Sequence, residues 1–394
     1  MKFTLMYLIL IVIFIMTTLV KADTVKIGGN IDISNLYCKS RTNDGKMHES
    51  NVKRLDTVLN IDYYLNDKVK FVLSPSYFFS DPIYNNIIKQ MVPERNYFYL
   101  TEAYVRLDID NDNYLTLGVI NFSKGSFYEY SFNGLKEGNG LFNIIDLNLQ
   151  GFLWSRKLTS TSYFSLGYLT EDKWIETDTE DTDYVLPNFR NFDNSEMLTF
   201  IYKNRLGRNY FEFNFFGTKS TLLGKHVLDN DLMAFGYSYN NEDITGEVYY
   251  FVLAFSRTYG TTEILEETPT DPRIELGFVN DSGYSLFFGY KKELDRLIFN
   301  RDNMIGVEIQ YQSDNFYSLN RGKPNSMYGY GNNGLTINAH AGVRYNRNTL
   351  FKIRYCYFNK DNSVNKIGIT PITNVEGVFV DNIHAVMLQL YYNF

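Results

Sequence analysis

The stretch NIHAVMLQLYYNF, residues 382–394, closes the chain and decides how the rest of it is interpreted. Every second residue from Val386 to Phe394 is apolar or aromatic, while Gln389 and Asn393 lie among the intervening positions. Because successive side chains of a strand point to opposite faces, this period of two separates an apolar face from a more polar one. Such a strand can lie between lipid and water. A half-buried strand of a soluble protein has the same pattern and is the alternative.

The amino-terminal residues decide between these alternatives. Lys2 precedes an apolar stretch from Phe3 to Val20, and Val20 and Ala22 occupy the two positions that signal peptidase reads. We predict a signal peptide over residues 1–22, cleaved after Ala22, and one mature domain over residues 23–394. An uncleaved anchor is the alternative, because the stretch is long enough to span a bilayer. No later segment approaches the roughly 20 apolar residues that a membrane helix needs.

Composition also favours strands. The chain has 33 Tyr and 31 Phe but only 8 Pro, a bias typical of pleated sheets and of aromatic girdles at membrane interfaces. The net charge of −7 argues against a nucleic-acid partner. Cys38 and Cys356 are too few for a disulfide framework. Closure of a barrel would leave their strands one strand apart, which exceeds the reach of a disulfide.

The final strand resembles the closing strand of bacterial outer-membrane β-barrels, which ends in Phe or Trp and is recognised by the barrel assembly machinery. The resemblance implies that Tyr392 and Phe394 are the assembly signal, with outer-membrane lipid around the protein. It also implies a location in the outer membrane of a Gram-negative-type bacterium.

Short connections rich in Asn, Asp and Gly alternate with longer ones along the chain, and Asn, Asp and Gly tolerate the backbone angles of tight turns. Eight turns and nine long loops predict an all-β fold, a transmembrane antiparallel up-and-down β-barrel of eighteen strands. Sixteen strands are the alternative, because residues 147–158 and 315–320 are ambiguous. Asp281, Ser282 and Gly283 are among the predicted turns, and residues 257–271 are a predicted long loop. Short periplasmic turns and long extracellular loops are typical of such barrels.

By pattern, the whole mature chain resembles the porin class, although no subfamily signature is present. In porins the loop that follows the fifth strand folds into the lumen, so the loop of residues 121–145 is the candidate constriction. Its charged residues are Lys124, Glu129, Lys136 and Glu137. An ordinary exposed loop is the alternative.

Strand alternation assigns a set of charged residues to the wall of the lumen. The set is Arg54, Lys68, Lys70, Glu102, Arg106, Asp108, Glu308, Arg344, Lys352 and Arg354. Because the first and last strands meet when the barrel closes, many of these cations would share one side of the lumen. A cationic wall opposite an acidic loop creates a field across the channel. A wall of mutually paired charges with little selectivity is the alternative.

These features predict a porin that passes ions and small hydrophilic solutes without catalysis. Lumenal aromatic residues, exemplified by Tyr104, Tyr114 and Tyr249, leave room for stacking on sugars. The chain has four His and lacks a serine or paired-acid motif, a phosphate loop and a metal-ligand cluster, so we expect no enzyme, cofactor or metal. A surface adhesin that uses the long loops is the alternative function. Trimerisation, common in the porin class, and ion selectivity are not determined by the sequence.

Overall fold

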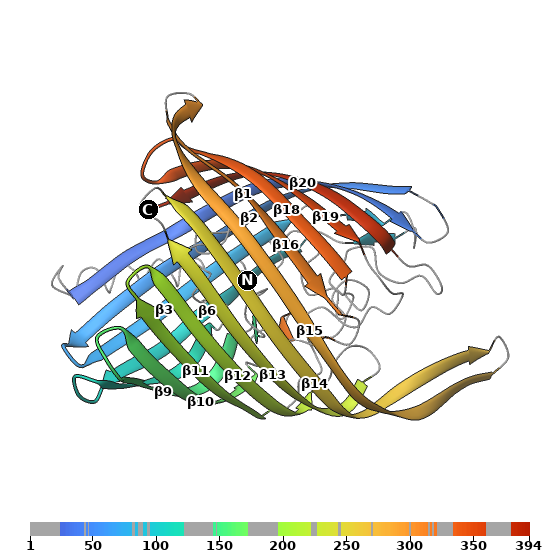
Figure 1. The fold of residues 1–394 in the computed structure, drawn as a ribbon, viewed down its shortest axis with the longest axis horizontal. Helices are drawn as coiled ribbons and strands as arrows, with labels where there is room; N and C mark the ends of the chain where they lie inside the picture. The colour runs from blue at the N-terminus through green and yellow to red at the C-terminus, as the bar shows by residue number, and fades with distance from the viewer. Residues whose placement is uncertain are drawn as a thin grey trace.

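Sixteen strands of the protein form one closed barrel, which Figure 1 shows with strands inclined to its long axis. The computed structural model describes residues 24–42, 45, 47–80, 83–85, 90–92, 95–121, 145–146, 148–171, 196–221, 227–242, 246–268, 271–298, 301–313, 316, 319–320, 334–359 and 380–394. The barrel strands are β1 (Val25–Thr42), β2 (Met47–Asn66), β3 (Val69–Ser80), β6 (Arg95–Asp108), β7 (Asn113–Asn121), β9 (Asn148–Lys157), β10 (Ser162–Glu171), β11 (Glu196–Leu206), β12 (Asn209–Thr221), β13 (Val227–Glu242), β14 (Glu247–Thr268), β15 (Asp271–Ile298), β16 (Arg301–Gln312), β18 (Gly334–Arg344), β19 (Thr349–Asn359) and β20 (Val380–Asn393).

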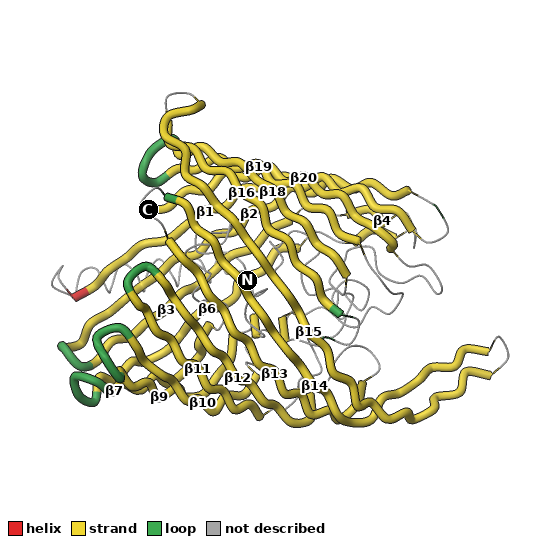
Figure 2. Tube along the Cα trace, in the orientation of Figure 1, coloured by secondary structure: helices red, strands yellow, loops and turns green. Residues whose placement is uncertain are grey.

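Neighbouring barrel strands are antiparallel, and β20 pairs with β1 to close the cylinder. Short turns at residues 67–68, 109–112, 158–161, 207–208 and 345–348 lie at one end of the barrel, where β1 begins and β20 ends (Figure 2). Both termini of the barrel therefore lie on the side of the short turns. Nowhere in the described ranges is there a helix long and apolar enough to cross a membrane.

The preferred prediction of eighteen strands is wrong, and the alternative of sixteen is correct. Asp281, Ser282 and Gly283 form no turn, because β15 runs through them and pairs continuously with β14. The same ladder occupies most of the loop predicted at residues 257–271. Turn-forming residues are accommodated here because strand preference depends on the pairing around a residue as well as on its type.

The described part of the strand predicted at residues 315–320 contributes no barrel strand. Of these residues, Leu319–Asn320 form β17, which pairs in parallel with β8 (Ile145–Asp146). A second small sheet pairs β4 (Ile83–Asn85) with β5 (Gln90–Val92). The two regions explain the miscount: one predicted turn is absent, and one predicted strand lies outside the barrel.

The two faces of the barrel have the reverse of the distribution found in soluble proteins. On β14, Phe251, Leu253 and Phe255 are exposed on the outer face. On β19, the inward-facing Lys352 and Arg354 are buried. A soluble protein rarely exposes a continuous apolar surface and buries charges, so this arrangement fits a lipid exterior. The alternation predicted for residues 303–312, 334–346 and 349–359 is confirmed.

The seam between β1 and β20 ends at the terminal aromatic residue. Gly29 and Phe394 exchange two backbone hydrogen bonds of 3.1 and 3.0 Å. The Phe394 ring packs so closely on Gly29 that an added Cβ would lie 2.6 Å from the ring carbon Cζ. Tyr392 and Phe394 both face outward, with ring centroids 6.4 Å apart. Glycine at this position thus lets the last side chain cover the seam.

The two cysteines lie on either side of β20. Cys38 of β1 and Cys356 of β19 are both paired with Ala385 in the strand register, and both are buried thiols outside any disulfide. Their separation by one strand confirms the prediction. With Leu36, Ile383, Ala385 and Met387 they form an apolar cluster on the inner face, which we call the seam cluster.

Candidate functional site: the inner face of the barrel

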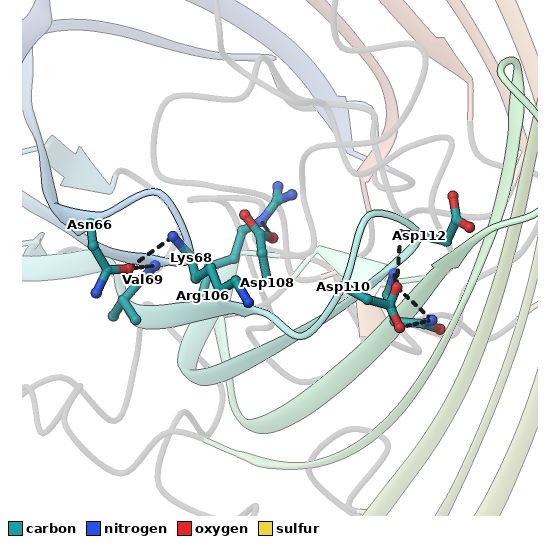
Figure 3. Close-up of polar contacts among 8 residues, drawn as sticks. Asn66, Lys68, Val69, Arg106, Asp108, Asp110 and Asp112 are labelled. Atoms are coloured by element: carbon teal, nitrogen blue, oxygen red, sulfur yellow. Dashed lines mark hydrogen bonds and ion pairs between the residues drawn. The ribbon is translucent and has the colours of Figure 1, made fainter.

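The inner face holds most of the charged residues that the sequence assigns to the lumen. Lys124, Glu129, Lys136 and Glu137 lie outside the described residues. Arg344 is at the end of β18, in the inward-facing set with His340. Lys68 lies instead in the exposed turn after β2, where its backbone N–H donates to Asn66 Oδ1 at 2.8 Å (Figure 3). Lys68 is therefore not part of the wall.

On β2, β3 and β6, four inward-facing charged residues form two ion pairs. Lys70 Nζ lies 2.7 Å from Asp62 Oδ2, and Arg106 Nε lies 2.8 Å from Asp108 Oδ1. The Arg106 guanidinium also covers the Tyr114 ring at 3.9 Å from its centroid. We call these five residues the paired group. For this part of the wall, the alternative of mutually paired charges describes the structure.

A further buried pair was not among the predicted residues. Lys203 of β11 lies 3.4 Å from Glu212 of β12, and Lys203 Nζ is 5.8 Å from the Tyr163 ring centroid. Cross-strand register places all three side chains in one row on the inner face. Leu198, Phe200 and Tyr202 alternate with the positions of Thr199 and Lys203, and this alternation could have identified Lys203 from the sequence.

Across the seam the structure brings other predicted cations to one side of the barrel. Lys352 is paired with Gln389, Gln389 with Ser34, and Ser34 with Arg54, so one row crosses β19, β20, β1 and β2. Arg354 follows Lys352 by two residues on the same face. We call Arg54, Lys352 and Arg354 the seam cations.

The buried carboxylates near the seam are bound by neutral donors. Gln389 Nε2 donates to Asp32 Oδ2 at 2.6 Å. The Tyr250 hydroxyl donates to Glu308 Oε1 at 2.6 Å, and Asn338 Nδ2 donates to the other oxygen at 3.5 Å. On β6, Glu102 accepts a 3.5 Å hydrogen bond from Ser74. These acids thus have partners other than the seam cations.

Tyr250 reaches Glu308 across an intervening strand because β15 has a glycine there. Gly289 is paired with both Tyr250 and Glu308. A Cβ atom at Gly289 would overlap the Tyr250 ring. The prediction that Tyr249 faces the lumen is wrong: Tyr249 is 45% exposed on the outer face, and its neighbour Tyr250 faces inward. Tyr104 and Tyr114 do belong to the inward-facing set, through Val72 and Asp108.

The small sheet of β8 and β17 joins two connections that leave distant parts of the barrel. One residue separates β8 from β9, the sixth strand of the barrel, whereas β17 follows β16, the thirteenth. In a closed cylinder of sixteen strands, these two strands lie on nearly opposite sides. The backbone pairing of Ile145 with Leu319 and of Asp146 with Asn320 therefore links opposite sides of the barrel.

The inner face offers no evident metal centre. Among residues whose placement is described, no group of three or more His, Cys, Asp or Glu could hold a metal ion. His340 lies inward and buried, whereas His384 is on the outer face with its Nδ1 2.7 Å from the Tyr355 hydroxyl.

Comparison with known proteins identifies the fold. The sequence matches no protein-family model, and a comparison with curated proteins gives no match. Among solved structures, the barrel is similar to an anion-selective porin from Comamonas acidovorans, with a TM-score of 0.55 and 10% identity over 94% of this chain and 99% of that chain. It is also similar to OmpF of Salmonella typhi in complex with daunomycin, with a TM-score of 0.56 and 12% identity over 95% of this chain and 99% of that chain. The chain therefore has the fold of the outer-membrane porins.

Proposed function

We propose that the protein is an outer-membrane porin, through which ions and small hydrophilic solutes diffuse passively and without catalysis. One observation carries this proposal: a closed barrel with an apolar outer face and charged, polar residues on its inner face. Barrels of sixteen to eighteen strands are wide enough for an aqueous channel. The polar inner face replaces part of the hydration of a passing solute, while the apolar outer face contacts lipid.

The charges of the wall would act on solutes in two ways. The paired group contributes local dipoles and a hydrated surface but little net charge. The seam cations add positive charges at the seam, with Arg54 on β2 and with Lys352 and Arg354 on β19. A solute with separated charges would therefore be oriented as it passes.

Planar-bilayer recording tests the proposal. The purified mature chain should insert from detergent and give stepwise openings whose conductance rises with KCl concentration. Uncharged sugars should enter proteoliposomes at rates that fall with sugar size. A folded barrel that inserts without conducting would contradict the proposal. Fractionation of cells would test the proposed location and signal peptide, and cross-linking in membranes would test a homotrimer.

A surface-binding function is the second candidate, and one feature favours it. The pairing of β14 with β13 ends at Thr262, and the pairing of β15 with β16 begins at Ser285. Among the described residues, 263–268 and 271–276 pair only with each other, as a hairpin that projects beyond the barrel (Figure 1). Strands with open edges are suited to binding another polypeptide. Replacing the hairpin with a short turn should abolish such binding and leave conductance unchanged.

A further inference from the structure

Among the seam cations, Arg54 and Arg354 differ from other cations of the inner face in having buried donors without acceptors. Arg354 is 2% exposed, and its Nη1 and Nη2 atoms are buried without a hydrogen-bond partner. Arg54 is 9% exposed, and its Nη1 atom is also buried without a hydrogen-bond partner. By contrast, Lys70, Arg106 and Lys203 each lie within 3.4 Å of a carboxylate oxygen.

The nearby acids Asp32 and Glu308 are not acceptors for the unpartnered arginine donors. Asp32 and Glu308 are bound by Gln389 and Tyr250, respectively, through hydrogen bonds of 2.6 Å. Within the described part of the chain, no ion pair joins Arg54 or Arg354 to a carboxylate. Buried charged donors that lack an acceptor are unfavourable, so the site is incomplete without an anion or bound water.

The spacing of the seam cations fits a small oxyanion. Lys352 and Arg354 are two residues apart on one strand face, about 7 Å between Cα atoms. Arg54 lies three strands from Lys352, about 14 Å between backbones, and both side chains point into the barrel. The seam cluster borders Arg354 through Cys356 and Met387, and its apolar surface strengthens electrostatic attraction at the site.

We propose that the seam cations form a binding site for the carboxylate or phosphate group of a passing solute. The two terminal nitrogens of Arg354 match the paired oxygens of such a group, and Lys352 adds a second charge. Arg54, across the seam, would receive the second acidic group of a dianionic solute. This inference rests on the proposed channel, because it places a binding site for organic acids and phosphates on one wall of that channel.

Current block by inorganic phosphate tests the site in the reconstituted channel. At constant KCl, phosphate should reduce the current through the unmodified channel in a saturable manner. Arg354→Gln should weaken the apparent phosphate affinity about tenfold or more, because it removes the guanidinium group and its two charged hydrogen bonds to the phosphate oxygens. Arg54→Gln should weaken pyrophosphate block more than phosphate block. Arg106→Gln is the matched control, since Arg106 is already bound to Asp108, and it should retain phosphate affinity within about twofold.

A second measurement separates failure of the site from failure of the channel. Phosphate should raise the thermal unfolding temperature of the folded, detergent-solubilised protein, and Arg354→Gln should remove that shift while Arg106→Gln retains it. If no variant conducts, the porin proposal fails, and the thermal shift still tests the site. If the channel conducts but phosphate acts linearly with concentration, or equally on the Arg354→Gln variant, only water fills the gap and the site is refuted.

Discussion

An arginine placed on the outer face at mid-strand is the most direct test of the barrel in a membrane. Leu253 of β14 is 44% exposed and faces outward. On the same face, Tyr249 lies four residues before it and Arg257 four residues after it. With strands tilted by about 45° and a rise of about 3.3 Å per residue, each interval corresponds to about 9 Å of depth. Leu253 is therefore close to the middle of an apolar band about 25 Å high.

We expect Leu253→Arg to lower the free energy of unfolding in lipid vesicles by about 2–4 kcal/mol, the cost of arginine at the bilayer midplane. At 1.4 kcal/mol per tenfold, this is roughly a 30- to 700-fold change in the folding equilibrium. Urea titration of the vesicle-embedded barrel, with tryptophan fluorescence as the readout, measures the change directly.

Gln310→Arg is the matched control. Gln310 of β16 lies on the inner face, two strands from β14, beside Tyr311, which shares the cross-strand row of Leu253 and Leu286. An arginine there lies two residues from Glu308 on the same face, which can accept its hydrogen bonds, so we expect a smaller cost than at Leu253. Equal costs for the two variants, or no cost at Leu253, would refute the assignment of lipid to the outer face.

Three further predictions concern the inner face, a turn and the connections. Tyr250→Phe removes the hydrogen bond to Glu308 and should lower the free energy of unfolding by about 1.5–3 kcal/mol, whereas Tyr249→Phe on the exposed outer face should have little effect. The pKa of Asp110 is lowered by hydrogen bonds from the Asp112 backbone N–H and then from the Asn113 side chain (Figure 3). The ionised Asp110 carboxylate therefore stabilises the folded protein fully above the ordinary aspartate pKa of about 3.9, and this stabilisation is lost as the pH falls through the lower folded-state pKa. The difference in unfolding free energy between the unmodified protein and Asp110→Ala should be largest near neutral pH and should narrow in acid. A difference independent of pH would contradict this. A disulfide between Asp146→Cys and Asn320→Cys should form on oxidation and change single-channel conductance reversibly on reduction, while either single variant should not respond.

The class of fold could be predicted from the sequence because apolar and polar residues alternate with a period of two, which indicates strands with two different faces. Alternation in residues 303–312, 334–346 and 382–394 assigned outer and inner faces correctly, since a two-residue period directly reflects strand geometry. The same alternation assigned Arg54, Lys352 and Arg354 to the inner face. Closure of the barrel then predicted that Cys38 and Cys356 lie one strand apart.

The local sequence did not specify every side-chain direction or the number of strands. Tyr249 and Tyr250 are adjacent and chemically identical, so only the register of β14 decides which of them reaches the interior. Asp281, Ser282 and Gly283 have the residue types of a turn, yet pairing with β14 keeps them in a strand. Such pairing joins residues far apart in the sequence, and no local preference specifies it.

By itself, the sequence determined the cylinder, the polarity of its faces and the charged residues of its inner wall, because each follows from the alternation within single strands. Only the tertiary structure decided the number of strands, the link between β8 and β17, and which buried cations have acceptors. Those properties depend on register and on hydrogen bonds between strands, where a shift of one residue exchanges the two faces.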